Sequence, residues 1–243
     1  MSNYRVEALN NNTLIIERRQ GALKSLPAVI FIHGGADSAG NALTIIKPSG
    51  TGVGRNYENE VFKSIADAGY RVIAPAVGAS FGATAGQNII DSTYTRLQTD
   101  LFPAKVHLMG GSAGACLALN WMWRNSAKVA SAFLYVPLVD VEALYNRDNT
   151  FRAAIEAAYG HVPTQTDYDN FDPSHNHANI APQASKIKVW YGTNDTVIPV
   201  GTPEAFITAI GCESTQTAAN HFNGYDPLYW NRQEPVAWFN NHP

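Results

Sequence analysis

Two hydrophobic periodicities alternate along most of the 243-residue chain. Short apolar runs are typical of buried strands, and the segments between them carry apolar residues at helical spacing. The strands are expected at residues 27–35, 71–77, 105–110, 129–140, 186–192 and 212–219. The helices are expected at residues 56–70, 86–102, 112–126, 151–160, 203–211 and 234–241. This alternation predicts an α/β fold with a mostly parallel central sheet and helices on both faces.

The chain begins with a different pattern. Residues 4–9 and 13–19 are strand-like and flank an Asn-rich turn, which predicts an N-terminal antiparallel hairpin. No repeat, charge block or linker divides the rest, so residues 1–243 are expected to form a single domain. Residues 145–185 are the least regular part, and we expect a small lid or irregular excursion over the carboxyl edge of the sheet.

The helical spacing also predicts which side chains are buried. Gly69 is expected to end the first helix of the main α/β pattern. The side chains expected in the core include Val61, Ile65, Ala68, Ile90, Tyr94, Leu97, Trp121, Trp123 and Trp190.

One strand-to-helix junction carries candidate chemistry. Residues 106–121 read VHLMGGSAGACLALNW, so Ser112 stands between glycines in a G-x-S-x-G pattern, after a strand and before a helix. Small neighbours permit a tight turn in which the serine backbone is strained and its Oγ is exposed. The unpaired N–H groups of the new helix then lie beside the hydroxyl.

In this context the chain resembles the α/β-hydrolase superfamily, in particular its carboxylesterases and the related lipases and peptidases. The resemblance extends over roughly the whole sequence, and it implies that a nucleophilic serine is followed first by an acid and then by a histidine. A serine hydroxyl needs such a base, and the base needs an orienting carboxylate.

The resemblance assigns the acid to the loop after a late strand. Asp195 lies in GTNDTVIP, which is similar to the G-x-x-D-x-x-x-P loop of the family. Asp140, at the end of the strand YVPLVD, is the alternative, since some members take the acid from that earlier strand. His221, in the loop after the last predicted strand, is the expected base. The other downstream histidine, His242, is expected to be frayed next to the chain end.

An oxyanion formed at the reacting carbonyl needs fixed N–H donors, each worth about 2.7–4 kcal/mol of the barrier. The resemblance assigns one donor to the backbone of Ala113 and the other to the loop His33-Gly34-Gly35-Ala36. This loop reads HGGA, where the family form is HGGG. The second donor is therefore Gly35 or Ala36, with Gly35 favoured, and His33 is expected to shape the loop.

Composition and charge narrow the function classes. The formal charge of −3 gives no electrostatic reason to bind nucleic acid or an anionic membrane. No apolar run approaches the ~20 residues of a membrane span, and no secretory signal is visible, so a cytoplasmic location is the default expectation. Cys116 and Cys212 do not suggest a disulfide framework. His175 and His177 are expected to be loop or lid residues, and neither a metal nor a cofactor is expected.

These features predict a serine hydrolase that cleaves small-molecule or surface-displayed carboxylic esters through Ser112, His221 and Asp195. An ester is favoured over a peptide because the chain is short and leaves no room for a large gating domain. Thioesterase or lipase activity on the same fold is an alternative. Another is a binding or structural module that has kept the fold without turnover.

Overall fold

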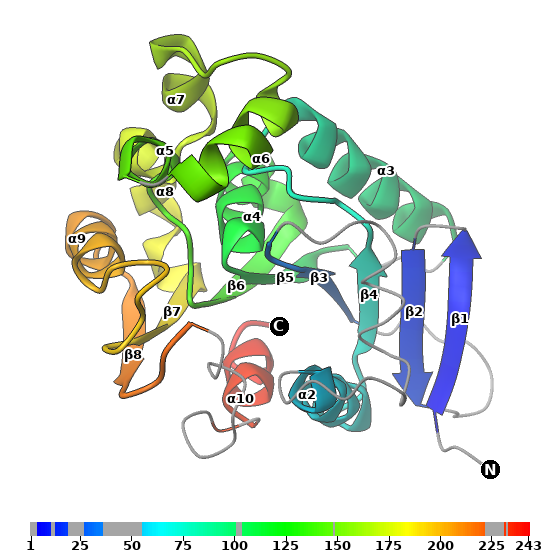
Figure 1. The fold of residues 1–243 in the computed structure, drawn as a ribbon. Helices are drawn as coiled ribbons and strands as arrows, with labels where there is room; N and C mark the ends of the chain where they lie inside the picture. The colour runs from blue at the N-terminus through cyan, green and yellow to red at the C-terminus, as the bar shows by residue number, and fades with distance from the viewer. Residues whose placement is uncertain are drawn as a thin grey trace.

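The computed structural model describes residues 4–10, 13–18, 27–35, 55–100, 104–147, 149–221, 231 and 233–243. Within these residues, eight strands form one sheet in the order β1-β2-β4-β3-β5-β6-β7-β8 (Figure 1). The strands are β1 (Tyr4–Asn10), β2 (Thr13–Arg18), β3 (Ala28–Ile32), β4 (Arg71–Pro75), β5 (Val106–Gly111), β6 (Val129–Tyr135), β7 (Ile187–Gly192) and β8 (Glu213–Thr217).

The pairing confirms the predicted sheet. β1 and β2 form the antiparallel hairpin, β2 runs antiparallel to β4, and every pairing from β4 to β8 is parallel. In the centre, Ala28 of β3 lies opposite Val106 of β5, and Ile32 lies opposite Gly110. The carboxyl ends of β3, β5, β6, β7 and β8 therefore meet along one edge, where an open α/β sheet positions its functional loops.

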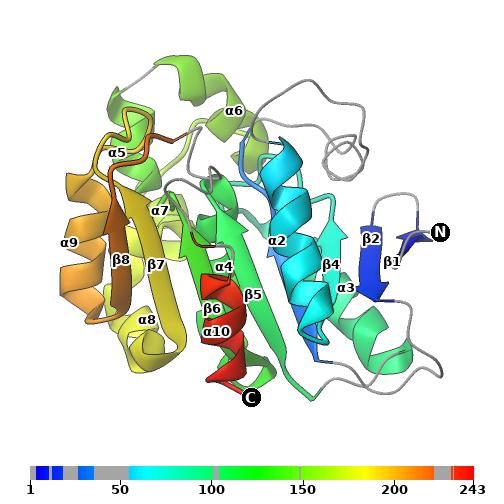
Figure 2. The ribbon, with the colours of Figure 1, turned by 90° about the horizontal axis from the view of Figure 1, so that it is seen from below.

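The helices cover both faces of the sheet. They are α2 (Arg55–Asp67), α3 (Thr84–Asp100), α4 (Ala113–Arg124), α5 (Val141–Arg147), α6 (Asn149–Tyr159), α7 (Gln165–Phe171), α8 (His177–Ile180), α9 (Gly201–Ile210) and α10 (Glu234–Asn240). Figure 2 shows α2 and α10 together on one face. In Figures 1 and 2, α3, α4 and α9 lie on the other side of the sheet, and α5 and α6 lie at its carboxyl end.

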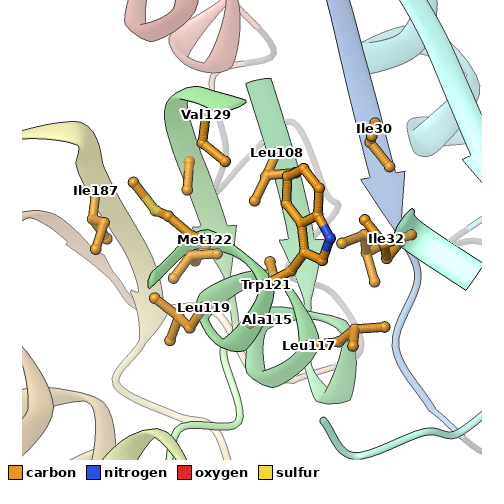
Figure 3. Packing of buried hydrophobic residues seen from close by; sticks show 14 of the residues in the cluster. Ile30, Ile32, Leu108, Ala115, Leu117, Leu119, Trp121, Met122, Val129 and Ile187 are labelled. Atoms are coloured by element: carbon orange, nitrogen blue, oxygen red, sulfur yellow. The ribbon is translucent and has the colours of Figure 1, made fainter. Parts of the chain in front are cut away.

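Each face has its own apolar core. On the α4 side, the fully buried indole of Trp121 packs among aliphatic side chains of β3 and β5, such as Ile30, Ile32 and Leu108 (Figure 3). On the other side, α2 and α10 pack against Val29, Val72 and the other buried strand side chains of that face. Since β3 to β7 are covered on both faces, their near-continuous apolar composition follows from their position.

Most of the predicted core residues are buried, with two corrections. Val61, Ile65, Ile90, Tyr94, Leu97, Trp121 and Trp190 are all buried. Ala68 is exposed because α2 ends at Asp67, one residue earlier, and the helical phase is lost. Trp123 is only half-buried, and the guanidinium of Arg124 lies 4.3 Å from its ring centroid. Gly69 ends the helical segment with φ 92°, as predicted.

Residues 145–185 are largely helical. The helix predicted at residues 151–160 is present as α6, and α7, α8 and short 3-10 turns, which were not predicted, follow it. Thr164 and Asp167 form a capping box at the start of α7, which satisfies backbone N–H groups that the first helical turn leaves free. The segment is also bonded to the core, because the Tyr159 hydroxyl donates to the Phe81 carbonyl at 3.1 Å.

His242 is also held more firmly than expected. Its Nδ1 lies 2.8 Å from the Trp238 carbonyl oxygen, and its Nε2 lies 3.1 Å from that of Ser185. Its ring packs against Trp238 in a tilted arrangement, with a centroid separation of 4.0 Å. These contacts fix the end of the chain against the turn before β7, so the expectation of a frayed His242 is wrong.

Candidate active site

Ser112 occupies a strained turn between β5 and α4. Its φ of 49° and ψ of −123° lie in a region that residues with a Cβ rarely adopt. Such a conformation costs on the order of 1–3 kcal/mol, so surrounding contacts must hold it in place. The local geometry is that of the strand–serine–helix turn predicted from the G-x-S-x-G pattern.

The glycines around Ser112 allow close packing of three segments. A Cβ on Gly34 would lie 2.6 Å from both the Ser112 Cβ and the Gly111 carbonyl oxygen. A Cβ on Gly114 would overlap the Ile32 carbonyl oxygen at the end of β3. The start of α4 and the loop after β3 therefore meet directly at the serine, at a distance that only glycine permits.

The end of β6 holds the turn from the other side. The Ser112 N–H donates to the Tyr135 carbonyl at 3.2 Å, and the Leu138 N–H donates to the Ser112 carbonyl at 3.0 Å. Between them, Val136 has φ 39°, which is unusual for a β-branched residue, and its N–H donates to the Trp190 carbonyl at 2.9 Å. These hydrogen bonds could not be predicted from the sequence, because they join backbone groups and do not depend on which side chains are present.

The three residues singled out from the sequence lie together in one hydrogen-bonded chain. Ser112 Oγ is 3.1 Å from His221 Nε2, and His221 Nδ1 is 2.8 Å from Asp195 Oδ2. Asp195 and His221 are both buried. When the Nδ1 proton is donated to the carboxylate, Nε2 presents its lone pair to the Ser112 hydroxyl. The arrangement can therefore accept the serine proton and stabilise the resulting imidazolium.

The loops that carry Asp195 and His221 are bonded to each other. The Asn194 N–H donates to the Ala219 carbonyl at 3.1 Å, and the Asn194 side-chain amide donates to the Ala218 carbonyl at 2.6 Å. A Cβ on Gly192, at the end of β7, would overlap the Ala219 carbonyl oxygen. These contacts explain how residues 26 positions apart come to lie within one hydrogen bond.

Backbone donors fix the Asp195 carboxylate itself. Its Oδ1 accepts the N–H groups of Val197 at 2.9 Å and Ile198 at 2.8 Å, while Oδ2 faces His221. Both oxygens are therefore bonded, and the carboxylate cannot rotate away from the imidazole without breaking contacts.

The alternative acid, Asp140, has a different place. Its Oδ1 accepts the Ala143 N–H at 2.8 Å in the first turn of α5. This is the contact of an N-terminal helix cap. In the structure it is Asp195, not Asp140, that bonds His221.

The expected oxyanion donors are only partly described. Ala113 is the first residue of α4, so its N–H has no partner four residues earlier in the helix. Gly35 has φ 81°, a left-handed conformation that glycine adopts without strain, in the loop that touches Ser112 through Gly34. Ala36 lies outside the described residues.

An apolar cluster adjoins the serine. Ala113 is buried together with Phe81 and Leu138 from the core and with Ile155 and Tyr168 from the segment 145–185. Ile198 of the Asp195 loop belongs to the same cluster. One flank of the site is thus apolar, and part of it is contributed by α6 and α7.

His175 lies in a 3-10 turn and His177 begins α8, both within the segment 145–185. His175 bridges two helices, with Nε2 2.9 Å from Glu142 Oε2 and Nδ1 3.0 Å from Asp169 Oδ1. Burial alone would lower the pKa of His175, but these hydrogen bonds outweigh it and raise the pKa. Among the described residues, no group of three or more His, Cys, Asp or Glu side chains could hold a metal ion.

Both cysteines are unpaired and buried. Burial raises the pKa of Cys116 well above its usual value and that of Cys212 to about 11, so neither thiol is readily ionised. Within the part of the chain that the structure describes, no helix is long and apolar enough to cross a membrane.

Fold and site together define the class of protein. A mostly parallel sheet covered on both faces, with a serine at the turn after its central strand β5, is the architecture of a serine hydrolase with the α/β-hydrolase fold. The family can also be stated. The model of the prolyl oligopeptidase family matches residues 89–223, more than half of the sequence, and the chain belongs to this family.

Solved structures share the fold at low sequence identity. FphF, a fluorophosphonate-binding serine hydrolase of Staphylococcus aureus, is 16% identical with a TM-score of 0.67, over 93% of this chain and 90% of that one. An S-formylglutathione hydrolase from Agrobacterium tumefaciens is 11% identical with a TM-score of 0.68, over 98% and 94%. A puromycin-hydrolyzing peptidase of Mycobacterium tuberculosis is 16% identical with a TM-score of 0.67, over 98% of this chain but 39% of that one. Comparison with curated protein sequences finds no relative.

Proposed function

We propose that the protein hydrolyses carboxylic esters by acyl transfer to Ser112. The observation that carries this proposal is the continuous contact from Ser112 Oγ to His221 Nε2, at 3.1 Å, and from His221 Nδ1 to Asp195, at 2.8 Å. A hydroxyl in that setting can lose its proton to the imidazole as it attacks a carbonyl carbon.

Each residue has a defined part in the proposed reaction. Ser112 attacks the carbonyl, and His221 takes the hydroxyl proton and returns it to the departing alkoxide, which leaves as an alcohol. Water then attacks the acyl-enzyme, with His221 again taking and returning the proton, and the carboxylic acid departs. Asp195 holds the imidazole orientation and stabilises the imidazolium.

The oxyanion that forms at each attack needs donors fixed beforehand. We assign these to the N–H of Ala113, at the positive end of α4, and to the N–H of Gly35, with Ala36 as the alternative. The approach of Gly34 to the Ser112 Cβ supports this assignment, because it brings the loop after β3 next to the reacting hydroxyl.

Two observations bear on the substrate: the first favours an apolar acyl group, and the second favours an ester or a thioester over an amide. The cluster that includes Ala113 and Ile198 provides an apolar surface next to Ser112 and next to the Asp195 loop. The fold is also shared over nine-tenths of both chains with FphF and with the S-formylglutathione hydrolase.

We further infer that residues 1–243 act as one domain. In it, residues 145–185 form a wall of the site, because Tyr159 and Phe171 bond them to the core.

Cleavage of amides is the second candidate, and the family supports it. The match to the prolyl oligopeptidase family covers the region that contains Ser112, Asp195 and His221. An amide places a greater demand on the same residues, because the departing amine must be protonated by His221 as it leaves.

A matched substrate panel separates these candidates. We expect p-nitrophenyl esters from acetyl to decanoyl to be hydrolysed, and p-nitroanilides of the same acyl groups and of aminoacyl-proline not to be cleaved above the background rate. A thioester series measured alongside tests the thioesterase alternative. Since peptidases also cleave activated esters, turnover of the anilides would replace the ester proposal with the amide one. No turnover of any of these substrates would favour a binding module.

A further inference from the structure

Arg147 links the segment after β6 to the loop of Asp195. It is the last residue of α5, and its Nη2 donates to the Val197 carbonyl at 2.6 Å, across 50 positions of sequence. Arg147 is an exposed residue, so this contact is not a by-product of core packing.

The acceptor belongs to a peptide group that also bonds Asp195. The Val197 carbonyl and the Ile198 N–H are the two ends of the same peptide, and this N–H donates to Asp195 Oδ1 at 2.8 Å. A cation on the carbonyl oxygen polarises the peptide and makes its N–H a stronger donor. A hydrogen bond with one ionised partner is already the stronger kind, and here both ends of the peptide bond a charged group.

The helix that carries Arg147 is itself held in place. At its start, Asp140 Oδ1 accepts the Ala143 N–H, and Asp172 Oδ2 accepts the Glu142 N–H at 2.8 Å. At its end, Arg152 Nε donates to the Tyr145 carbonyl at 3.0 Å. The guanidinium of Arg147 therefore projects from a fixed support, which is what a group that holds a loop requires.

We infer that Arg147 is a positioning residue for Asp195, acting through the single Val197–Ile198 peptide group. This inference rests on the proposed function, because it matters for turnover only if Asp195 orients His221. It gives the segment that begins with α5 a direct role in holding the acid, in addition to its apolar contacts near Ser112.

The test compares Arg147→Gln with Arg147→Lys and with Arg152→Gln as the matched control. Arg152 is an arginine of the same segment that also donates to backbone carbonyls, but it bonds those of Tyr145 and Asn146 in α5 and not one in the Asp195 loop. We expect Arg147→Gln to lower kcat about tenfold with little change in KM, since a hydrogen bond with a charged partner is lost. Arg147→Lys, which keeps the charge and a donor, should recover part of the loss. Arg152→Gln removes a contact with α5 but none with the Asp195 loop, so it should lose far less kcat than Arg147→Gln.

The pH profile of kcat/KM separates positioning from other effects. Its acidic limb reports protonation of the base. A less firmly held Asp195 stabilises protonated His221 less, so we expect the limb of Arg147→Gln to move to lower pH. If Arg147 acted only as a nearby positive charge, its removal would relieve repulsion and move the limb to higher pH, which would overturn the inference.

Thermal unfolding and Ser112→Ala complete the design. If the acidic limb of Arg147→Gln does not move while its unfolding midpoint falls, the substitution has merely loosened α5. An equal loss of kcat in Arg152→Gln would mean the same. Either result would also overturn the inference. If Ser112→Ala is inactive while Arg147→Gln matches the wild type, only the role of Arg147 fails. If Ser112→Ala keeps its activity, the proposed function fails instead.

Discussion

Ser112→Ala is expected to lower kcat for the best p-nitrophenyl ester by about 10⁴-fold or more. The methyl group cannot attack a carbonyl, and the hydroxyl that lies 3.1 Å from His221 Nε2 is removed. The alanine also fits the space, so the fold and the affinity for a bound ester should be kept. Stopped-flow or steady-state release of p-nitrophenol measures the loss, and the unfolding midpoint shows that the variant is folded.

Ser92→Ala is the control for this experiment. Ser92 is exposed on α3, and its hydroxyl donates to the Asn88 carbonyl of its own helix. It should keep the wild-type kcat. A loss of less than tenfold in Ser112→Ala, with the background rate subtracted, would show that the hydroxyl at residue 112 is not the nucleophile.

Asp195→Asn is expected to lower kcat by about 10⁴-fold, because the amide no longer holds the imidazole in the required tautomer. The volume is almost unchanged, and the amide oxygen can still accept the N–H groups of Val197 and Ile198. The loss should therefore appear in kcat and in the pH profile while the protein stays folded.

Asp140→Asn separates the two candidate acids. Asp140 caps α5, so its substitution should have at most a small effect on stability, since asparagine is also a good cap. Its kcat should remain within a few-fold of the wild type. Loss of activity in Asp140→Asn, with activity retained in Asp195→Asn, would transfer the acid role to Asp140.

The fold could be predicted from the sequence because its signals are local. Apolar runs such as residues 27–35 and 105–110 marked strands that are covered on both faces, and the glycines around Ser112 marked a turn too tight for larger residues. The errors arose where local signals end. Ala68 keeps the apolar spacing but lies one residue past α2, and Trp123 is held half-exposed against the Arg124 guanidinium.

Within residues 145–185, α6 was predicted, but α7 and α8 were harder to predict for a different reason. α7 is short and polar, and its stability comes from the Thr164 cap and from contacts with the core. The Phe171 carbonyl at its end accepts bonds from Asn120 and Cys116 on α4, more than 45 positions earlier in the sequence. Contacts of this kind leave no periodic pattern.

In the candidate site, too, some residues could be predicted from the sequence and others could not. Ser112, Asp195 and His221 could be singled out because the order of serine, acid and histidine resembles a known superfamily, and the structure brings the three side chains together. Arg147 and the 135–138 segment were missed. Their contacts are made to backbone carbonyls and N–H groups, so the identity of the partner residue carries no signal.

Labelling with a fluorophosphonate tests the nucleophile most directly, because the reagent needs an activated serine but no knowledge of the natural substrate. We expect one adduct per chain in the intact mass, located in the tryptic peptide of residues 106–124, where Ser112 is the one serine. Labelling should be lost in His221→Ala, since the base is then absent. An unlabelled protein, or an adduct on a different residue, would contradict the assignment of Ser112.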